Sequence, residues 1–314
     1  MTLRGLDDLQ RRWAVLGFGW AVIRKYLDDG GFREAALITY YGFLSLFPVL
    51  LLGVAVVSRV LARRPGLRHD LVTAIVPAAL RPGVEAFMAG LPATPTALAA
   101  GIAGLVFTGI GVVLSAYETL NHLAAVPVRR RAGVFARYVR AVAALVVLLT
   151  GTVALGALTV ASTALPSLPL PARAVTVLGS VGVSFAVLLA VARLLLVRRA
   201  PFGALWPAAV IGAVAVTLLL HVGAAVLPGL VRRAGWIYGG FATVAGVFTL
   251  LYLLSNLLVV AAEVAVVRYA RLWPRALDPR RPTAADARAM TLLVREQERM
   301  PAARIDYVLY SPAG

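Results

Sequence analysis

Residues 36–57, ALITYYGFLSLFPVLLLGVAVV, contain no charged side chain. At about 1.5 Å per residue, a helix of these 22 residues is long enough to cross the roughly 30 Å hydrocarbon core of a bilayer. Two charged residues, Arg33 and Glu34, stand just before it. The stretch therefore predicts a membrane-spanning helix over about 36–58, and the rest of the chain must be arranged around it.

The first half of this span is more polar than a helix surrounded by lipid needs to be. Tyr40, Tyr41, Ser45 and Pro48 recur there at helical spacings. Pro48 cannot donate a hydrogen bond to the carbonyl of Leu44, so we expect a kink at this point. Two interpretations stay open. The tyrosines form an interfacial aromatic pair ahead of a structural kink, or a bent polar segment lines a path through a helical bundle.

The composition places the whole chain among membrane proteins. Hydrophobic residues make up 61% and charged residues 14% of its 314 residues, which lies outside the range of soluble domains. The net charge of +17 does not point to nucleic acid, because the arginines lie at the ends of apolar runs, where they face lipid phosphates. We expect anionic membrane lipids as partners, with a second copy of the chain or an envelope protein as further possible partners.

Five more apolar runs predict five more spans, over about 96–117, 141–164, 174–197, 202–227 and 236–262. The expected fold class is all-α, a polytopic helical membrane protein with six transmembrane helices. The second span is rich in glycine, which lets helices approach closely in lipid. The longest loop, 62–96, is interrupted by prolines, and we favour a segment that rests on the bilayer over one that caps the bundle.

Both ends of the chain are predicted to lie outside the hydrocarbon core of a six-span domain over 31–270. Residues 1–30 place apolar side chains at steps of three and four with charges on other faces, which predicts one interfacial amphipathic helix that ends at Gly30. The tail over 271–314 is basic. Within it Thr283 and Asp286 match a capping box that opens a short helix.

The distribution of basic residues predicts the orientation of the spans. With six spans, 23 of the 31 Lys and Arg residues lie on the side of the chain termini and eight on the opposite side. Because cytoplasmic loops are enriched in Lys and Arg, we expect both termini in the cytoplasm. For a bacterial protein the membrane is then the inner, cytoplasmic one.

Four charged residues, Glu34, Glu118, Arg193 and Glu263, fall at the cytoplasmic ends of the predicted spans. A charge costs about 2.5–3.5 kcal/mol at the bilayer centre and less near the interface, so all four are acceptable as snorkelling span ends. In the functional alternative, Glu118 and Glu263 turn inward and pair with Arg193 to form a polar vestibule. Glu263 is the strongest single candidate because it follows a long uncharged stretch, and Asn121 adds a polar group next to Glu118.

The sequence contains none of the motifs that would indicate an enzyme. Its three histidines are scattered over different segments without the spacing of a metal site. A phosphate-binding loop needs a lysine after its glycines, and Lys25 is the only lysine in the chain. No serine-nucleophile elbow occurs either. We therefore expect no enzymatic activity, no metal and no cofactor.

Short motifs occur in a characteristic order along most of the chain: REAA at 33–36, TYY at 39–41, SLFP at 45–48, LNH at 120–122, WP at 206–207, YG at 238–239 and AAE at 261–263. In order and spacing they resemble the BrkB/YihY-like family of bacterial inner-membrane proteins. The chain departs from that pattern at Leu123 and Ala124, where the family has an apolar residue and a tryptophan.

The resemblance implies a link to virulence or serum resistance and to export of lipid-like molecules. Members have also been labelled ribonuclease, a label we set aside because no carboxylates or histidines here converge on a metal and a phosphate.

Two functional hypotheses remain. In the first, the protein is a transporter or flippase that moves an anionic amphiphile outward from the cytoplasmic leaflet. Arg193 would attract the headgroup, Glu118 and Glu263 would gate its movement, and the polar residues of the first span would line the path. In the second, it is an envelope scaffold or resistance factor that binds anionic lipids or partner proteins. Charge-neutral changes at Glu118 and Glu263 distinguish the two hypotheses.

Overall fold

The structure is a computed structural model that describes residues 3–61, 95–164, 170–198 and 200–308. Every regular element in these residues is a helix, which confirms the predicted all-α class. Six helices are long and apolar enough to cross a membrane, as predicted. They are α3 (Gly31–Leu61), α6 (Pro95–Leu123), α7 (Val134–Ala164), α8 (Leu170–Leu195), α9 (Phe202–Tyr238) and α10 (Gly240–Ala270). The loop predicted at 62–96 lies almost entirely outside the described residues.

Several helices extend beyond the predicted spans, because the polar turns at their ends remain helical. The largest difference concerns the last two. The predicted start of the sixth span at Trp236 is wrong, since α9 continues to Tyr238 and α10 begins at Gly240. Gly239 between them has a φ of +55°, a left-handed conformation that glycine adopts without the steric cost of a Cβ atom.

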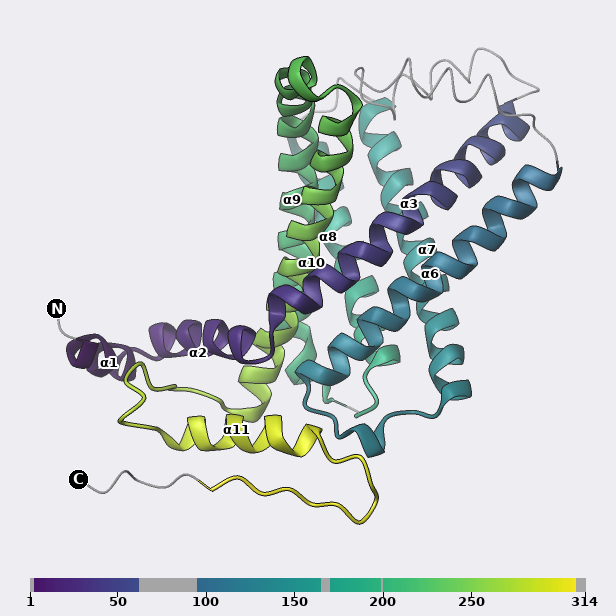
Figure 1. Ribbon diagram of the computed structural model, residues 1–314. Coiled ribbons are helices and arrows are strands. Elements are labelled where there is room, and N and C mark those ends of the chain that lie inside the picture. Colours follow the sequence, from purple (N-terminus) through teal and green to yellow (C-terminus); the bar gives the residue numbers. More distant parts are fainter. Residues whose placement is uncertain (1–2, 62–94, 165–169, 199, 309–314) are drawn as a thin grey trace.

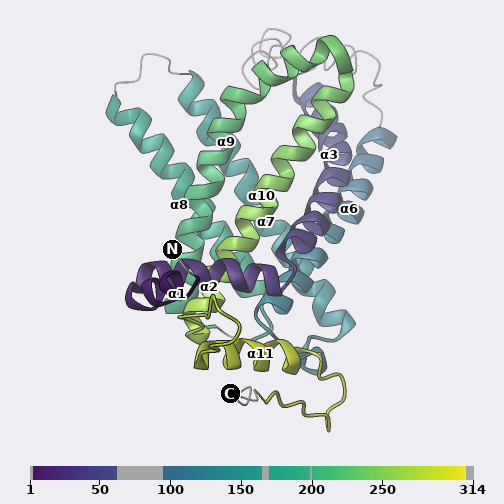
Figure 2. The same cartoon turned by 60° about the vertical axis from the view of Figure 1, so that its left-hand side comes forward.

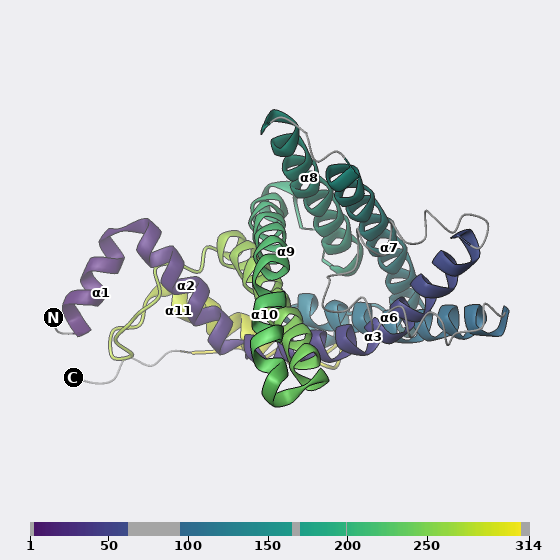
Figure 3. The same cartoon turned by 90° about the horizontal axis from the view of Figure 1, so that it is seen from above.

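The six spans form a closed ring. Each span packs against the next one along the chain, and α10 completes the ring by packing against α3. Viewed from above, the ring consists of three pairs, α3 with α6, α7 with α8, and α9 with α10 (Figure 3). The α3–α6 pair leans away from α9 and α10 toward one end of the ring (Figure 1), and α8 leans away from α10 on the other side (Figure 2).

The described parts of the N-terminal and C-terminal segments, 3–30 and 271–308, lie at the opposite end, which we call the terminal end (Figures 1 and 2). Three shorter helices lie at this end: α1 (Leu3–Arg12) and α2 (Ala14–Asp28), which project outward beside α10, and α11 (Ala284–Glu296), which lies below α2 and the end of α10 (Figures 1 and 3). The single helix predicted over residues 1–30 is wrong, because extended backbone at Trp13 separates α1 from α2. The predicted end at Gly30 is confirmed by a turn in which this glycine has a φ of +67°.

The helices α1 and α2 bury several polar side chains and leave several large apolar side chains exposed. Asp7 is fully buried and accepts a hydrogen bond of 2.9 Å from the backbone N–H of Leu277, with Gln10 buried beside it. Large apolar side chains point away from the protein, among them Val15, which is 82% exposed, and Ile23. Exposed apolar side chains on helices that project beside the ring are consistent with the predicted contact with the membrane surface.

The short helix α11 is anchored under the terminal end by its own first turn. Thr283 accepts a hydrogen bond from the backbone N–H of Asp286, and the Asp286 carboxylate accepts one in return from the Thr283 backbone, so the predicted capping box is confirmed. Arg275 bonds Asp286 at 2.6 Å and Asp28 of α2 at 2.8 Å. One arginine thereby fixes α11 against the N-terminal helices.

Candidate functional site

A cavity of about 460 Å³ lies inside the ring, and all six spans contribute to its wall. The lining residues come from the start of α3 and α9 and from the last turns of α6, α8 and α10, so the cavity lies in the half of the ring next to the terminal end. Nearly all of the lining is Ala, Val, Leu or Ile, and polar atoms come from Thr119, Arg198 and Tyr269. Leu292 of α11 also contributes, so the cavity extends to the covering helix.

Arg198 is the cationic residue of the cavity wall. Its guanidinium carbon lies 5.4 Å from the centre of the Tyr269 ring, a cation–π geometry that holds the side chain at the end of α10. Arg193, the arginine expected in this role, is exposed and stacks in the same way over Phe202, outside the cavity lining. The two arginines lie close in sequence but project to different places.

A buried ionic group lies behind the cavity wall, between α2 and α10. Lys25 pairs with Asp29 and lies 3.5 Å from Oε2 of Glu263. Its ammonium also donates a hydrogen bond of 3.1 Å to the backbone carbonyl of Leu123 at the end of α6. All three charged side chains are at least 97% buried, with exposures of 2% for Lys25, 3% for Asp29 and 0% for Glu263.

Burial changes the proton affinity of the groups on the α2 side of this cluster. Loss of water around Asp29 raises the pKa of that carboxyl above its ordinary value of 3.8, against the opposing effect of Lys25. Burial likewise raises the pKa of the Tyr26 hydroxyl to about 12. Tyr26 is hydrogen-bonded to Asn256 of α10, so the same interface is joined by a neutral pair.

Two further buried polar pairs tie the first span to its neighbours. Glu34 accepts a hydrogen bond of 2.7 Å from Thr119 of α6, and Thr39 donates one of 3.0 Å to Ser255 of α10. Since Thr119 also lines the cavity, the start of α3 and the cavity wall are directly connected. These contacts place Glu34 in a structural role between two spans.

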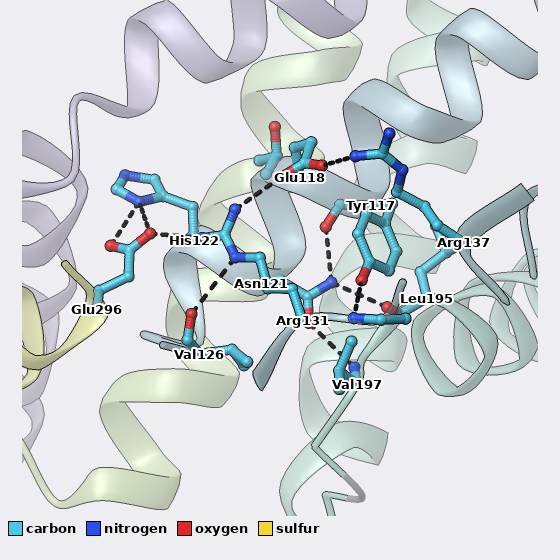
Figure 4. Close-up of polar contacts among 12 residues, drawn as sticks. Tyr117, Glu118, Asn121, His122, Val126, Arg131, Arg137, Leu195, Val197 and Glu296 are labelled. Carbon is cyan, nitrogen blue, oxygen red and sulfur yellow. Dashed lines mark hydrogen bonds and ion pairs between the residues drawn. The ribbon is translucent and has the colours of Figure 1, made fainter. Parts of the chain in front are cut away.

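An ionic cluster joins α11 to the loop between α6 and α7 (Figure 4). Arg131 lies at its centre and bonds Glu118 at 2.7 Å and Glu296 of α11 at 2.6 Å. The Nδ1 atom of His122 lies 2.8 Å from Glu296, and Arg137 bonds the other oxygen of Glu118 at 2.9 Å. The expected pairing of Glu118 and Glu263 with Arg193 is therefore wrong, because each glutamate has other partners.

Asn121 has a defined structural role at the end of α8. Its amide donates to the backbone carbonyls of Tyr117 at 2.8 Å and Leu195 at 2.9 Å, and its carbonyl accepts from the N–H of Val197 at 3.0 Å (Figure 4). The side chain is fully buried. It satisfies backbone groups left open where α8 ends, which fixes α6 to α8.

The four polar residues of the first span lie outside the cavity lining. Tyr40 and Tyr41 are exposed and contact each other edge to face. Ser45 donates a hydrogen bond of 2.7 Å to the carbonyl of Gly42 within its own helix. Pro48 faces Gly104 of α6, and α3 continues through it as a helix. Their observed contacts are those of helix packing.

Part of this arrangement could be predicted from the sequence. Glu263 was identified by its position after a long apolar run, whereas Lys25, Asp29 and Arg198 were not identified as site residues. The signal for Lys25 lay in composition, since it is the only lysine among 31 basic residues. Among the residues that the structure describes, no group of three or more His, Asp or Glu is placed to hold a metal ion.

The ring of six apolar helices around a cavity defines a polytopic helical membrane protein. The sequence model of the family described as Virulence factor BrkB matches residues 22–286, and the chain belongs to this family. The match covers all six spans and α2 from Val22 onward. No curated protein matches the chain. No solved structure matches it either.

Proposed function

We propose that this protein is a transporter of the bacterial inner membrane that moves an anionic amphiphile, of the lipid class, between the two leaflets. The observation that supports the proposal most is the apolar cavity inside the ring, with Arg198, an exposed residue, among those that line it. Its volume of about 460 Å³ lies within the usual range of ligand pockets, roughly 300–1,000 Å³.

The chemistry of the wall selects the class of ligand. A sugar or an inorganic ion would lose its hydrogen bonds to water in an aliphatic cavity, at a cost of several kcal/mol per group in the absence of new partners. A molecule with an apolar body and a negative head meets both parts of the wall: aliphatic side chains for the body, and Arg198 for the head.

The surroundings of the cavity also suit such a ligand. Exposed arginines at the terminal end, which is cytoplasmic in the predicted orientation, would attract anionic headgroups from the adjacent leaflet. Examples are Arg24, Arg33, Arg130 and Arg268. The exposed apolar side of α2 would hold this end at the membrane surface, so that a lipid need not leave the bilayer to reach the ring.

The test is translocation of labelled lipids in liposomes that contain the purified protein. We expect faster exchange between leaflets for labelled phosphatidylglycerol than in protein-free liposomes. Ala192→Leu extends a side chain of the cavity wall and should abolish the acceleration. Ala103→Leu adds the same atoms at an exposed position of α6 and should leave it unchanged. Arg198→Gln should slow the anionic lipid more than labelled phosphatidylcholine.

Equal exchange rates with and without protein, for both lipids and with an imposed ion gradient, would contradict the proposal. That result would favour the second candidate, an envelope scaffold that holds anionic lipids or partner proteins on its basic face. The scaffold hypothesis is supported by the exposed arginines at the terminal end, among them Arg12, Arg280, Arg288 and Arg304. Binding to anionic vesicles without translocation would support it.

A further inference from the structure

We propose that Lys25, Asp29 and Glu263 form a proton-binding site, and that binding and release of one proton there is coupled to movement of the amphiphile. The coupling rests on the function proposed above, whereas the binding of a proton does not. The ligand is a proton held on one of the two carboxyl groups. The site lies between α2 and α10, directly behind the cavity wall.

The first argument is the balance of charge. Two carboxylates and one ammonium group lie together, so the group has a net charge of −1 when all three are ionised. Glu263 is 0% exposed and Asp29 3% exposed, so water does not screen this charge. An uncompensated buried charge is strongly unfavourable, and two neighbouring buried carboxyl groups therefore retain a proton between them.

The second argument is the set of unsatisfied oxygen atoms. Both carboxylate oxygens of Glu263 and the Oδ1 atom of Asp29 are buried and have no hydrogen-bond donor among the residues that the structure describes. A buried acceptor without a donor costs free energy. A proton on either carboxyl supplies an O–H donor and also removes the net charge of −1. One bound proton therefore satisfies a buried acceptor oxygen and neutralises the group.

The other titratable groups around the site do not outweigh the burial of the carboxyl groups. On α2, burial raises the pKa of Tyr26 to about 12, so this hydroxyl adds no charge near neutral pH. On α6, His122 has its Nε2 atom 3.0 Å from the backbone carbonyl of Asp29 and its Nδ1 atom paired with Glu296 of α11. A charge on this imidazole favours the ionised form of Asp29, but burial has the larger effect and keeps the pKa of the Asp29 carboxyl above 3.8. Glu34 at the start of α3 is a carboxylate that accepts a hydrogen bond from Thr119, so it adds no positive charge to the site. Lys25 is the one ammonium group that pairs with both carboxylates among the described residues.

The site and the cavity share a wall. Leu123 lines the cavity and accepts the hydrogen bond from Lys25, and Ala262, next to Glu263, lines it as well. A change of charge at Glu263 alters its attraction for Lys25 across the α2–α10 interface, and thereby the packing of two wall segments. A proton suits this site better than a metal cation, because the ammonium of Lys25 already provides the cation between the two carboxylates.

The proton site is tested by infrared spectroscopy of the purified full-length protein in lipid nanodiscs as pH is varied. We expect the band of a protonated carboxyl group to persist well above pH of about 5, beyond the range of ordinary carboxyl groups. Glu263→Gln and Asp29→Asn should each remove or shift this band, while Glu118→Gln, at a glutamate paired with two arginines, should leave it in place. Absence of such a band in the wild-type protein would overturn the site.

The coupling is tested by the steady-state distribution of labelled phosphatidylglycerol across liposomes with an imposed pH gradient. Transport coupled to one proton shifts this distribution by up to about tenfold per pH unit, whereas in Glu263→Gln the distribution should no longer respond. Translocation that ignores the pH gradient, or follows a sodium gradient, overturns the coupling and leaves the transport proposal standing. Absence of any translocation refutes the transport proposal and the coupling together, and the infrared result still decides the proton site.

Discussion

The two ends of the helical ring are held together in different ways. At the terminal end, buried polar groups connect segments that are far apart in the sequence, as Lys25 of α2 connects to Glu263 of α10 and Arg131 connects to Glu296 of α11. Away from that end, the described contacts are mostly apolar, such as Gly104 of α6 against Pro48 of α3 within a pair, and Phe43 of α3 against Phe248 of α10 between pairs. The difference indicates where the ring is fixed and where the pairs are free to diverge.

For the transporter proposed above, we expect a ring that is held by buried polar groups at one end and by apolar contacts at the other to move more easily at its apolar end. The terminal end would act as the fixed base, while the three helix pairs would move relative to one another at the far end. The cavity lies in the fixed half, so its wall is positioned by the polar contacts. Four changes test this contrast, in order of decreasing expected effect.

The largest effect is expected at the buried ionic group. Lys25→Met leaves Asp29 and Glu263 without their cation and should destabilise the protein by about 3–5 kcal/mol, as removal of one partner from a buried pair does. Thermal unfolding in detergent measures the change. Lys25→Met combined with Glu263→Gln should recover part of the loss, because fewer buried charges remain. A Lys25→Met protein as stable as wild type would contradict the assignment of this end as the fixed base.

A smaller loss is expected at Asn121, which joins α6 to α8 through uncharged hydrogen bonds. Asn121→Ala leaves the carbonyl of Leu195 and the N–H of Val197 buried without partners and should cost about 2 kcal/mol. Thr150→Ala serves as the control, because that exposed hydroxyl bonds only within its own helix. Equal unfolding temperatures for the two variants would show that the α6–α8 contact is not structurally important.

The paired part of the ring is probed at Gly111 of α6. A Cβ atom there would lie 2.9 Å from the ring of Tyr41 on α3, so Gly111→Ala should destabilise the α3–α6 pair by about 1–2 kcal/mol. Gly156→Ala is the matched control, since no atom of the described residues lies within 4 Å of the added carbon. That variant should unfold at or slightly above the wild-type temperature. A destabilised Gly156→Ala protein would mean that glycine acts here through the backbone and not through close approach.

The smallest effect concerns the attachment of α11. Burial by itself would raise the pKa of Asp286, but hydrogen bonds from Thr283, Arg275 and the backbone of Ala276 outweigh burial and lower it below 3.8. Because the pKa is lower in the folded protein, the stabilisation is complete above about pH 4 and is lost as pH falls through the lowered value. The protection of the α11 backbone amides from hydrogen exchange, corrected for the intrinsic pH dependence of exchange, should therefore fall only at low pH.

Two variants at the C-terminal region check the cause of that pH dependence. In Asp286→Asn the attachment of α11 should be weaker at neutral pH and should no longer change as the solution is acidified. In Asp306→Asn the protection of α11 from hydrogen exchange should match wild type, because this side chain is 75% exposed in its pair with Arg295. Unchanged pH dependence in Asp286→Asn would assign the effect to another carboxyl group.

The sequence by itself determined the helices that depend only on residues close together in the chain. Six apolar runs of sufficient length predicted the six spans, and the pattern of Thr283 and Asp286 predicted the start of α11. It did not give the division of residues 1–30 at Trp13 or the exact turn at Gly239, because those depend on how α2 and α10 meet their neighbours.

The tertiary structure alone decided which side chains meet. A span that is apolar on every side has no polar stripe to mark its inner face, since lipid and protein interior are equally apolar surroundings. For this reason Arg193 and Arg198 could not be told apart from the sequence, although one stacks on Phe202 outside the cavity lining and the other lines the cavity. The partner of Glu263 is Lys25, at the opposite end of the chain, and only closure of the ring brings the two together.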